Sequence, residues 1–178
     1  MHVLLNLVLF QVAWVVTVAG AGAGYWWAGL AATAALGAIV FKLSPWPRTD
    51  FTLLCVGCLI GVVVDSLYVQ AGLLRYAEPV PFAGLAPIWI VAMWMSFALT
   101  LNHSMRFFKG KPLLSAIFGL VGGPLAYWVA QSKFAAVEFL WEPIWVYGVL
   151  GVAWALLTPF LMYLATTWLP RFDPAPAQ

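Results

Sequence analysis

Long apolar runs separated by short polar segments are the feature that most limits what this chain can fold into. Of its 178 residues, 65% are hydrophobic and only 8% are charged, whereas a typical soluble domain carries about 25% charged residues. A soluble protein of this size could not keep so much apolar surface away from water. The composition therefore excludes a soluble enzyme, a disordered chain and a disulfide-rich secreted domain, and it favours a membrane protein.

Six apolar runs cover residues 3–19, 25–40, 51–74, 85–105, 113–130 and 139–169. A segment that spans lipid must be a helix or part of a closed barrel, and continuous apolar runs are typical of helices. We therefore predict an all-α, polytopic transmembrane bundle of six membrane-spanning helices, the last near Ile144 to Trp168. Residues 1–169 form a single transmembrane domain in this prediction, and residues 170–178 form a short flexible tail.

The positions of the basic residues predict how the bundle is oriented. With six crossings, one side of the membrane holds both termini together with Lys42, Arg48, Arg106, Lys109, Lys111 and Arg171. The opposite side holds only Arg75 and Lys133. Because Lys and Arg gather in cytoplasmic loops, we predict that both termini and the tail lie in the cytoplasm. The net charge of +2 is too small and too dispersed for nucleic-acid binding, so the expected partner is the lipid bilayer.

The first apolar run has a second interpretation, as a secretory signal peptide cleaved within the small-residue stretch at 19–23. Cleavage would leave five spans. No Lys or Arg precedes the run, however, and Asn6 and Gln11 interrupt its apolar core. These features favour a retained first helix.

Asp65 is the acidic residue that the sequence places deepest in a predicted span. One helix face, followed in steps of three or four residues, carries Gly57, Gly61, Asp65, Tyr68 and Gly72. The Gly57 and Gly61 pair allows a neighbouring helix to approach closely, so Asp65 should point into the bundle with Ser66 beside it. An intramembrane acid is costly, which favours a role as proton carrier, general base or ligand anchor. The alternative is a buried carboxyl group that ties helices together.

The fourth run has a second polar face, which carries Trp89, Met93, Ser96, Thr100 and His103. Counting 1.5 Å per residue, His103 lies about 10 Å on the cytoplasmic side of the membrane centre and Asp65 about 5 Å on the other side. A direct Asp65–His103 hydrogen bond is therefore not expected. His103 is either a second catalytic candidate beside Asp65 or a capping histidine near the basic loop. Gln11, near the middle of the first run, could reach Asp65 or Ser66.

A ligand site is expected between the third, fourth and fifth helices, with polar and aromatic contacts from Asp65, Ser66, Gln11, Trp89, Ser96, Thr100 and Tyr127. The Cys55 and Cys58 pair has redox-motif spacing, but within a span we interpret both as small buried side chains. Metal-ligand clusters and phosphate-binding loops are absent from the sequence, so we expect neither metal nor cofactor. The glycines between 119 and 123 indicate a packing face.

Four segments together resemble a known family. They are Gly61-Val-Val-Val-Asp65-Ser66, Gly72-Leu-Leu-Arg-Tyr76, Pro87-Ile-Trp89 with Trp94 and Phe97 after it, and Gly119-Leu-Val-Gly-Gly-Pro-Leu-Ala-Tyr127. They are similar to the bacterial inner-membrane proteins grouped as domain of unknown function 2878, and the resemblance covers most of the chain. It implies a multi-pass inner-membrane protein without an assigned activity, often encoded beside genes for fatty-acid or phospholipid-tail modification. Asp65, Ser66, Gly123, Pro124 and Tyr127 match its motif positions, without roles.

Three functional hypotheses follow. The first is an accessory or binding component of membrane lipid metabolism, which holds a fatty-acid tail or similar lipid ligand near Asp65. The second is a small intramembrane enzyme that uses Asp65 as acid or base. The third is a small proton-coupled transporter. The glycine faces could pack within one bundle or between protomers, so a homo-oligomer is possible.

Overall fold

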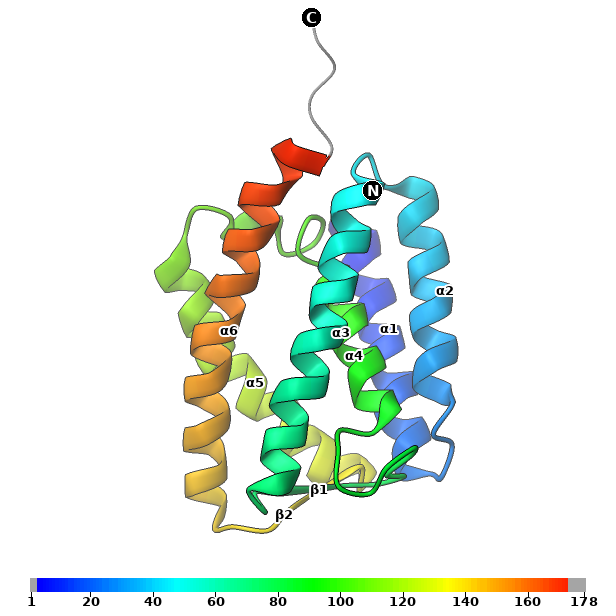
Figure 1. The fold of residues 1–178 in the computed structure, drawn as a ribbon, viewed down its shortest axis with the longest axis vertical. Helices are drawn as coiled ribbons and strands as arrows, with labels where there is room; N and C mark the ends of the chain where they lie inside the picture. The colour runs from blue at the N-terminus through cyan, green and yellow to red at the C-terminus, as the bar shows by residue number, and fades with distance from the viewer. Residues whose placement is uncertain (1–2, 173–178) are drawn as a thin grey trace, which may run out of the picture.

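The computed structural model describes residues 3–172, and Figure 1 shows them as a bundle of helices with short connections. The helices are α1 (Val3–Gly22), α2 (Ala28–Leu43), α3 (Pro47–Gln70), α4 (Ile88–Ala98), α5 (Pro112–Phe134) and α6 (Pro143–Phe172). A 3₁₀ turn, η1 (Arg106–Phe108), and two short strands, β1 (Leu74–Tyr76) and β2 (Val137–Phe139), lie between them. The all-helical bundle is thus confirmed, and α6 continues into the first residues of the predicted tail. Residues 173–178 of that tail lie outside the described part.

Four of the described helices, α1, α3, α5 and α6, are long and apolar enough to cross a membrane. The other two are shorter, with 16 residues in α2 and 11 in α4. At 1.5 Å per residue they reach about 24 Å and about 16 Å, against about 30 Å for the hydrocarbon core of a bilayer. The protein is therefore a membrane protein with four candidate spans. The count of six crossings and the cytoplasmic termini stay predictions.

Helix α4 lies in the interior of the bundle. It packs against α1, α2 and α3, while α5 pairs with α6 and α3 also contacts α6 (Figure 1). Nearly every α4 side chain from Trp89 to Ala98 is buried. A helix that is apolar on all sides is typical of a buried core position, which explains why so short a helix is stable here.

The fourth predicted helix is shorter than the apolar run that suggested it. The helix ends at Ala98 and residues 99–105 form turns. Polar side chains in this segment bond elsewhere, because the Thr100 hydroxyl donates to the Phe97 carbonyl at 2.6 Å and Asn102 donates to Asp50. Such bonds compete with helix continuation. The expectation that Thr100 and His103 share one α4 face with Trp89 is therefore wrong.

Two segments expected to be loops pair as an antiparallel ribbon, in which Arg75 lies opposite Glu138. Leu74 and Tyr76 point inward and are buried, whereas Arg75 points outward and is exposed. This alternation is the pattern of a half-buried strand. The ribbon connects the end of α3 to the segment between α5 and α6, and it fixes where the Tyr76 side chain enters the bundle.

Candidate functional site

The Asp65 carboxyl group is fully buried and accepts hydrogen bonds from three side chains of other elements. The Tyr127 hydroxyl of α5 donates to Oδ1 at 2.6 Å, and the Trp94 indole Nε1 of α4 donates to Oδ2 at 2.5 Å. The Tyr76 hydroxyl of β1 also donates to Oδ1. We call Asp65, Tyr76, Trp94 and Tyr127 the Asp65 cluster. It joins α3, α4, α5 and β1 at one buried carboxyl group.

Glycines on α3 explain how the Trp94 indole reaches Asp65. A Cβ atom added at Gly61 would lie 2.6 Å from Trp94 Cδ1, and one added at Gly57 would lie 2.8 Å from the Trp94 carbonyl oxygen. Only glycine allows helices to approach so closely at these positions. The glycine face predicts that Asp65 points into the bundle, and the buried Asp65 side chain has this orientation.

The Tyr76 hydroxyl beside Asp65 is held as a neutral phenol. Burial, together with the neighbouring Asp65, raises the pKa of the Tyr76 hydroxyl well above its ordinary value of 10.0. Tyr68 packs edge-on against Tyr127 with ring centroids 6.5 Å apart, and its buried hydroxyl has no hydrogen-bond partner among the described residues. The described hydrogen bonds to Asp65 thus come from hydroxyl and indole donors, and none of them comes from a cation.

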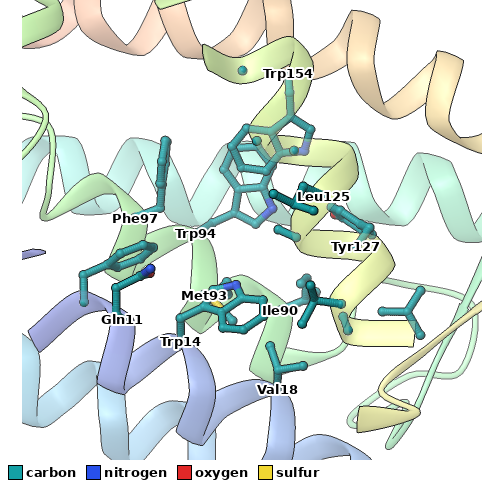
Figure 2. A pocket seen from close by; sticks show the side chains of 18 of the residues that line it. Gln11, Trp14, Val18, Ile90, Met93, Trp94, Phe97, Leu125, Tyr127 and Trp154 are labelled. Carbon is teal, nitrogen blue, oxygen red and sulfur yellow. The ribbon is translucent and has the colours of Figure 1, made fainter. Parts of the chain in front are cut away.

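A cavity of about 370 Å³ lies beside this cluster, between α1, α4 and α5, with one wall residue from α6. Figure 2 shows Gln11, Trp14 and Val18 reaching it from α1, and Ile90, Met93, Trp94 and Phe97 reaching it from α4. The α5 wall includes the glycines 119, 122 and 123 together with Tyr127. Trp94 and Tyr127 therefore belong both to the Asp65 cluster and to the cavity wall, whereas Asp65 itself does not line the cavity.

A stacked pair of indoles, Trp94 and Trp154, forms one end of the cavity. Their centroids lie 4.6 Å apart with planes 10° from parallel, and Phe97 meets Trp154 edge-on at 5.3 Å (Figure 2). Gly123 makes room for Trp154 on α5, because a Cβ atom added there would overlap the indole ring. The Trp154 Nε1 atom is buried and has no hydrogen-bond partner among the described residues.

The remaining predicted site residues divide between the cavity and other contacts. Gln11 and Trp89 line the cavity, and the Trp89 N–H donates to the Ala77 carbonyl at 2.8 Å. Ser66 accepts the Ala86 amide N–H at 3.0 Å, and Ser96 bonds Thr33 of α2 at 2.8 Å. None of the described contacts joins Gln11 to Asp65. The cavity lies between α1, α4 and α5, whereas we expected it between α3, α4 and α5.

Sequence reasoning missed a second buried carboxyl group, Asp50, at the opposite end of α3. Its side chain accepts from Asn102 Nδ2 at 2.7 Å and from the Ser44 hydroxyl at 2.5 Å, and it contacts His103 Nε2 at 2.9 Å. We call Ser44, Asp50, Asn102 and His103 the Asp50 cluster. Asp50 lies fifteen positions before Asp65, which is roughly 22 Å along a helix.

The sequence did contain a signal for this placement. The apolar run that predicts the third helix begins at residue 51 and leaves Asp50 outside it, but Pro47 is the first residue of α3 and Asp50 lies in its first turn. Proline is favoured at the first helical position, and acidic residues are favoured in the first turn. Lys109 joins the cluster by donating to Asn102 Oδ1 at 2.7 Å, and its partial burial lowers its pKa.

The cysteine pair differs from expectation, since Cys55 is exposed and Cys58 is only half-buried on the outer side of α3. The outer face of a membrane helix contacts lipid, so an apolar thiol is tolerated there as readily as in the core. Within residues 3–172, no group of three or more His, Cys, Asp or Glu side chains could hold a metal ion.

Comparison with known proteins gives a family without an assigned function. No curated protein and no solved structure matches this chain. The sequence model of one family matches residues 3–160, which include Asp50, Asp65 and the whole cavity wall. The chain belongs to the family described as Protein of unknown function (DUF2878).

Proposed function

We propose that this membrane protein binds the fatty-acid tail of a lipid in the cavity between α1, α4 and α5, as an accessory component of membrane lipid metabolism in the inner membrane. The observation that carries the proposal is that Trp94 and Tyr127 are both wall residues of the cavity and hydrogen-bond donors to Asp65. The buried carboxyl group thus fixes the position of the walls.

The size and chemistry of the cavity support an apolar occupant. Its volume of about 370 Å³ falls within the range of about 300–1,000 Å³ that is typical of small-molecule sites. Its wall is made of aromatic, aliphatic and glycine residues, with Gln11 and Tyr127 as the polar exceptions beside the indole N–H groups. Apolar walls with few polar groups are typical of small-molecule binding sites, and this wall favours an apolar occupant such as an acyl chain.

Asp65 acts in this proposal as a positioning residue. It does not line the cavity, and its two oxygens already accept three hydrogen bonds. A general acid or base must come within hydrogen-bond reach of its substrate. Asp65 could do so only if Trp94 or Tyr127 moved away, so the enzyme hypothesis has less support from the geometry than the binding hypothesis.

Native mass spectrometry of the protein in mild detergent tests the proposal, with a matched pair of glycine variants. A Cβ atom added at Gly122 would meet only the Phe118 ring, at 3.9 Å, so Gly122→Leu adds its side chain to the cavity region without backbone overlap. A Cβ atom added at Gly148 of α6 meets nothing within 4 Å, and this residue does not line the cavity. Gly148→Leu is therefore the control.

We expect the wild-type protein and Gly148→Leu to retain an acyl lipid, and Gly122→Leu to lose most of it. Retention that is equal in all three proteins would contradict a cavity-bound lipid. Absence of a bound lipid from the wild-type protein, together with no uptake of added lipid, would also contradict it. The same spectra report the number of copies in the assembly.

One observation favours proton-coupled transport as a second candidate. Helix α4 stops at Ala98, and the buried turns that follow contain Asn102 and His103 beside Asp50. Interrupted helices with buried polar groups are typical of transporter binding sites. Transport through this site predicts a pH-dependent flux into proteoliposomes that Asp50→Asn abolishes, and the absence of any flux would count against it.

A further inference from the structure

We propose that one end of the bundle binds the anionic headgroups of the surrounding bilayer, chiefly through Arg106 and Lys111 of the connection between α4 and α5. This end also contains the connection between α2 and α3, and Figure 1 shows both connections at the opposite end from β1 and β2. Neither Arg106 nor Lys111 lines the cavity, so the proposal does not depend on what the cavity holds.

Exposed cations gather at this end of the molecule without exposed anions. We call the four exposed basic residues the basic end, and they are Lys42, Arg48, Arg106 and Lys111. Among the described residues, the one acidic side chain at this end is Asp50, which is buried within its own cluster. None of the described ion pairs includes a residue of the basic end. Its positive charge is therefore available to an anionic partner.

The opposite end of the bundle has a different balance of charge. Arg75 and Lys133 share that end with the acidic residues Glu78, Glu138 and Glu142. Arg75 Nη1 already lies 2.8 Å from Glu138 Oε2. An anionic surface is therefore attracted to the basic end and not to the ribbon end.

The connection between α4 and α5 is attached to the bundle from the inside while its neighbouring cations remain exposed. The Lys109 ammonium group donates to the Asp50 cluster at 2.7 Å and to the Ala165 carbonyl of α6 at 3.3 Å. Gly110 has a φ of 73°, a conformation that glycine adopts without strain and that reverses the chain before α5. Arg106 and Lys111 are thus held in place before any partner arrives, which lowers the cost of binding.

The side chains around these cations favour a bilayer over a soluble acidic partner. Phe107 is 61% exposed with Lys111 Nζ 3.4 Å from its ring centroid, and Leu113 is 74% exposed. Aromatic side chains anchor proteins at the membrane–water interface, where Lys and Arg keep their stems in the apolar layer and their charges at the headgroups. The candidate spans α3 and α5 both begin at this end, which places it at a membrane surface.

Native mass spectrometry of the whole protein in mild detergent tests the proposal. The protein is mixed with equal amounts of phosphatidylglycerol and phosphatidylcholine that have identical acyl chains, so the ratio of the two bound lipids reports the headgroup preference alone. The test variant is Arg106→Gln/Lys111→Gln. The matched control, Arg75→Gln/Lys133→Gln, removes the same charge from exposed residues of the opposite end.

We expect the wild-type protein to bind at least about fivefold more phosphatidylglycerol than phosphatidylcholine, which is the effect of one Lys or Arg near an anionic surface. Arg106→Gln/Lys111→Gln should remove most of this preference without changing the bound phosphatidylcholine, which also shows that the variant is folded. The control should keep the preference. A higher ammonium acetate concentration should weaken it, because salt screens exposed charges.

Three results would overturn the proposal: equal binding of the two lipids by the wild-type protein, a preference that survives in Arg106→Gln/Lys111→Gln, or an equal loss in the control. Gly122→Leu separates this surface from the cavity, since it should retain less lipid in total but keep the headgroup preference. Loss of the preference in Gly122→Leu would place the headgroup at the cavity and also contradict the proposal.

Discussion

The two buried carboxyl groups of α3 have contrasting surroundings. Asp65 is held by two phenols and an indole, and two of these three donors are also walls of the apolar cavity. Asp50 contacts a histidine, an amide and a hydroxyl, with Lys109 next in the hydrogen-bond chain, and none of these residues lines the cavity. The same residue type thus holds two walls of the cavity in place at one end of the helix, and at the other end it attaches the helix to the segment after α4.

The contrast predicts that Asp50 contributes more to stability and Asp65 more to binding. Asp50→Ala leaves the Asn102 amide and the Ser44 hydroxyl without their acceptor, and His103 Nε2 without its partner. Leaving a buried polar group without its partner typically costs about 1–3 kcal/mol, and Asp50→Ala affects three such groups, so the combined cost should be about 3–5 kcal/mol. We expect a loss of this size in the free energy of unfolding, measured with denaturant in detergent. If Asp50→Ala reduces the free energy of unfolding by less than about 1 kcal/mol, the Asp50 cluster does not attach α3 to the segment after α4 in the way we describe.

Asp65→Asn tests the other end of the helix. The amide keeps the shape of the carboxyl group but has one acceptor oxygen instead of two, so at least one of the Trp94 and Tyr127 donors loses its partner. We expect a loss of about 1–3 kcal/mol in the free energy of unfolding, together with a clear reduction in the lipid retained on purification. If Asp65→Asn retains lipid at the wild-type level, the carboxyl group does not control binding in the cavity.

The pH dependence of stability should reveal the buried phenol of Tyr76. Because the pKa of Tyr76 is raised in the folded protein, the unfolded phenol ionises first, near its ordinary value of 10.0. The stabilisation is therefore fully present below pH 10 and is lost as the pH rises above it. We expect Tm to fall between pH 8 and pH 11 by a few degrees more in the wild-type protein than in Tyr76→Phe.

The lowered pKa of Lys109 has the opposite effect, because stability rises with pH between its folded pKa and the ordinary value of 10.5. This contribution is common to the wild-type protein and Tyr76→Phe, so it cancels when the two are compared. An equal fall in Tm for both proteins would show that the Tyr76 phenol is not held neutral by the fold.

The smallest effect is expected at an ion pair outside both clusters. Arg75 Nη1 lies 2.8 Å from Glu138 Oε2 across the β1–β2 ribbon, and the two side chains are 66% and 58% exposed. Exposed pairs contribute about 0–1 kcal/mol. Arg75→Ala should therefore change the free energy of unfolding by less than about 1 kcal/mol. A larger loss would mean that the ribbon, and not the buried carboxyl groups, controls the stability of this end.

The sequence predicted the features that depend on local pattern. Apolar runs predicted the helices, and the spacing of Gly57, Gly61 and Asp65 predicted which side of α3 faces inward. The sequence could not predict where α4 ends, because that depends on Asn102 and His103 reaching Asp50, which is about fifty residues earlier in the chain. The Tyr76 contact was also unpredictable, since the β1–β2 pairing brings together segments about sixty residues apart.

A density map of the protein in lipid nanodiscs would test the central claim most directly. Our account predicts elongated density between α1 and α5, in contact with Met93 and Phe97. A map in which α1 and α5 close together and Trp14 fills the space against Trp94 would contradict it.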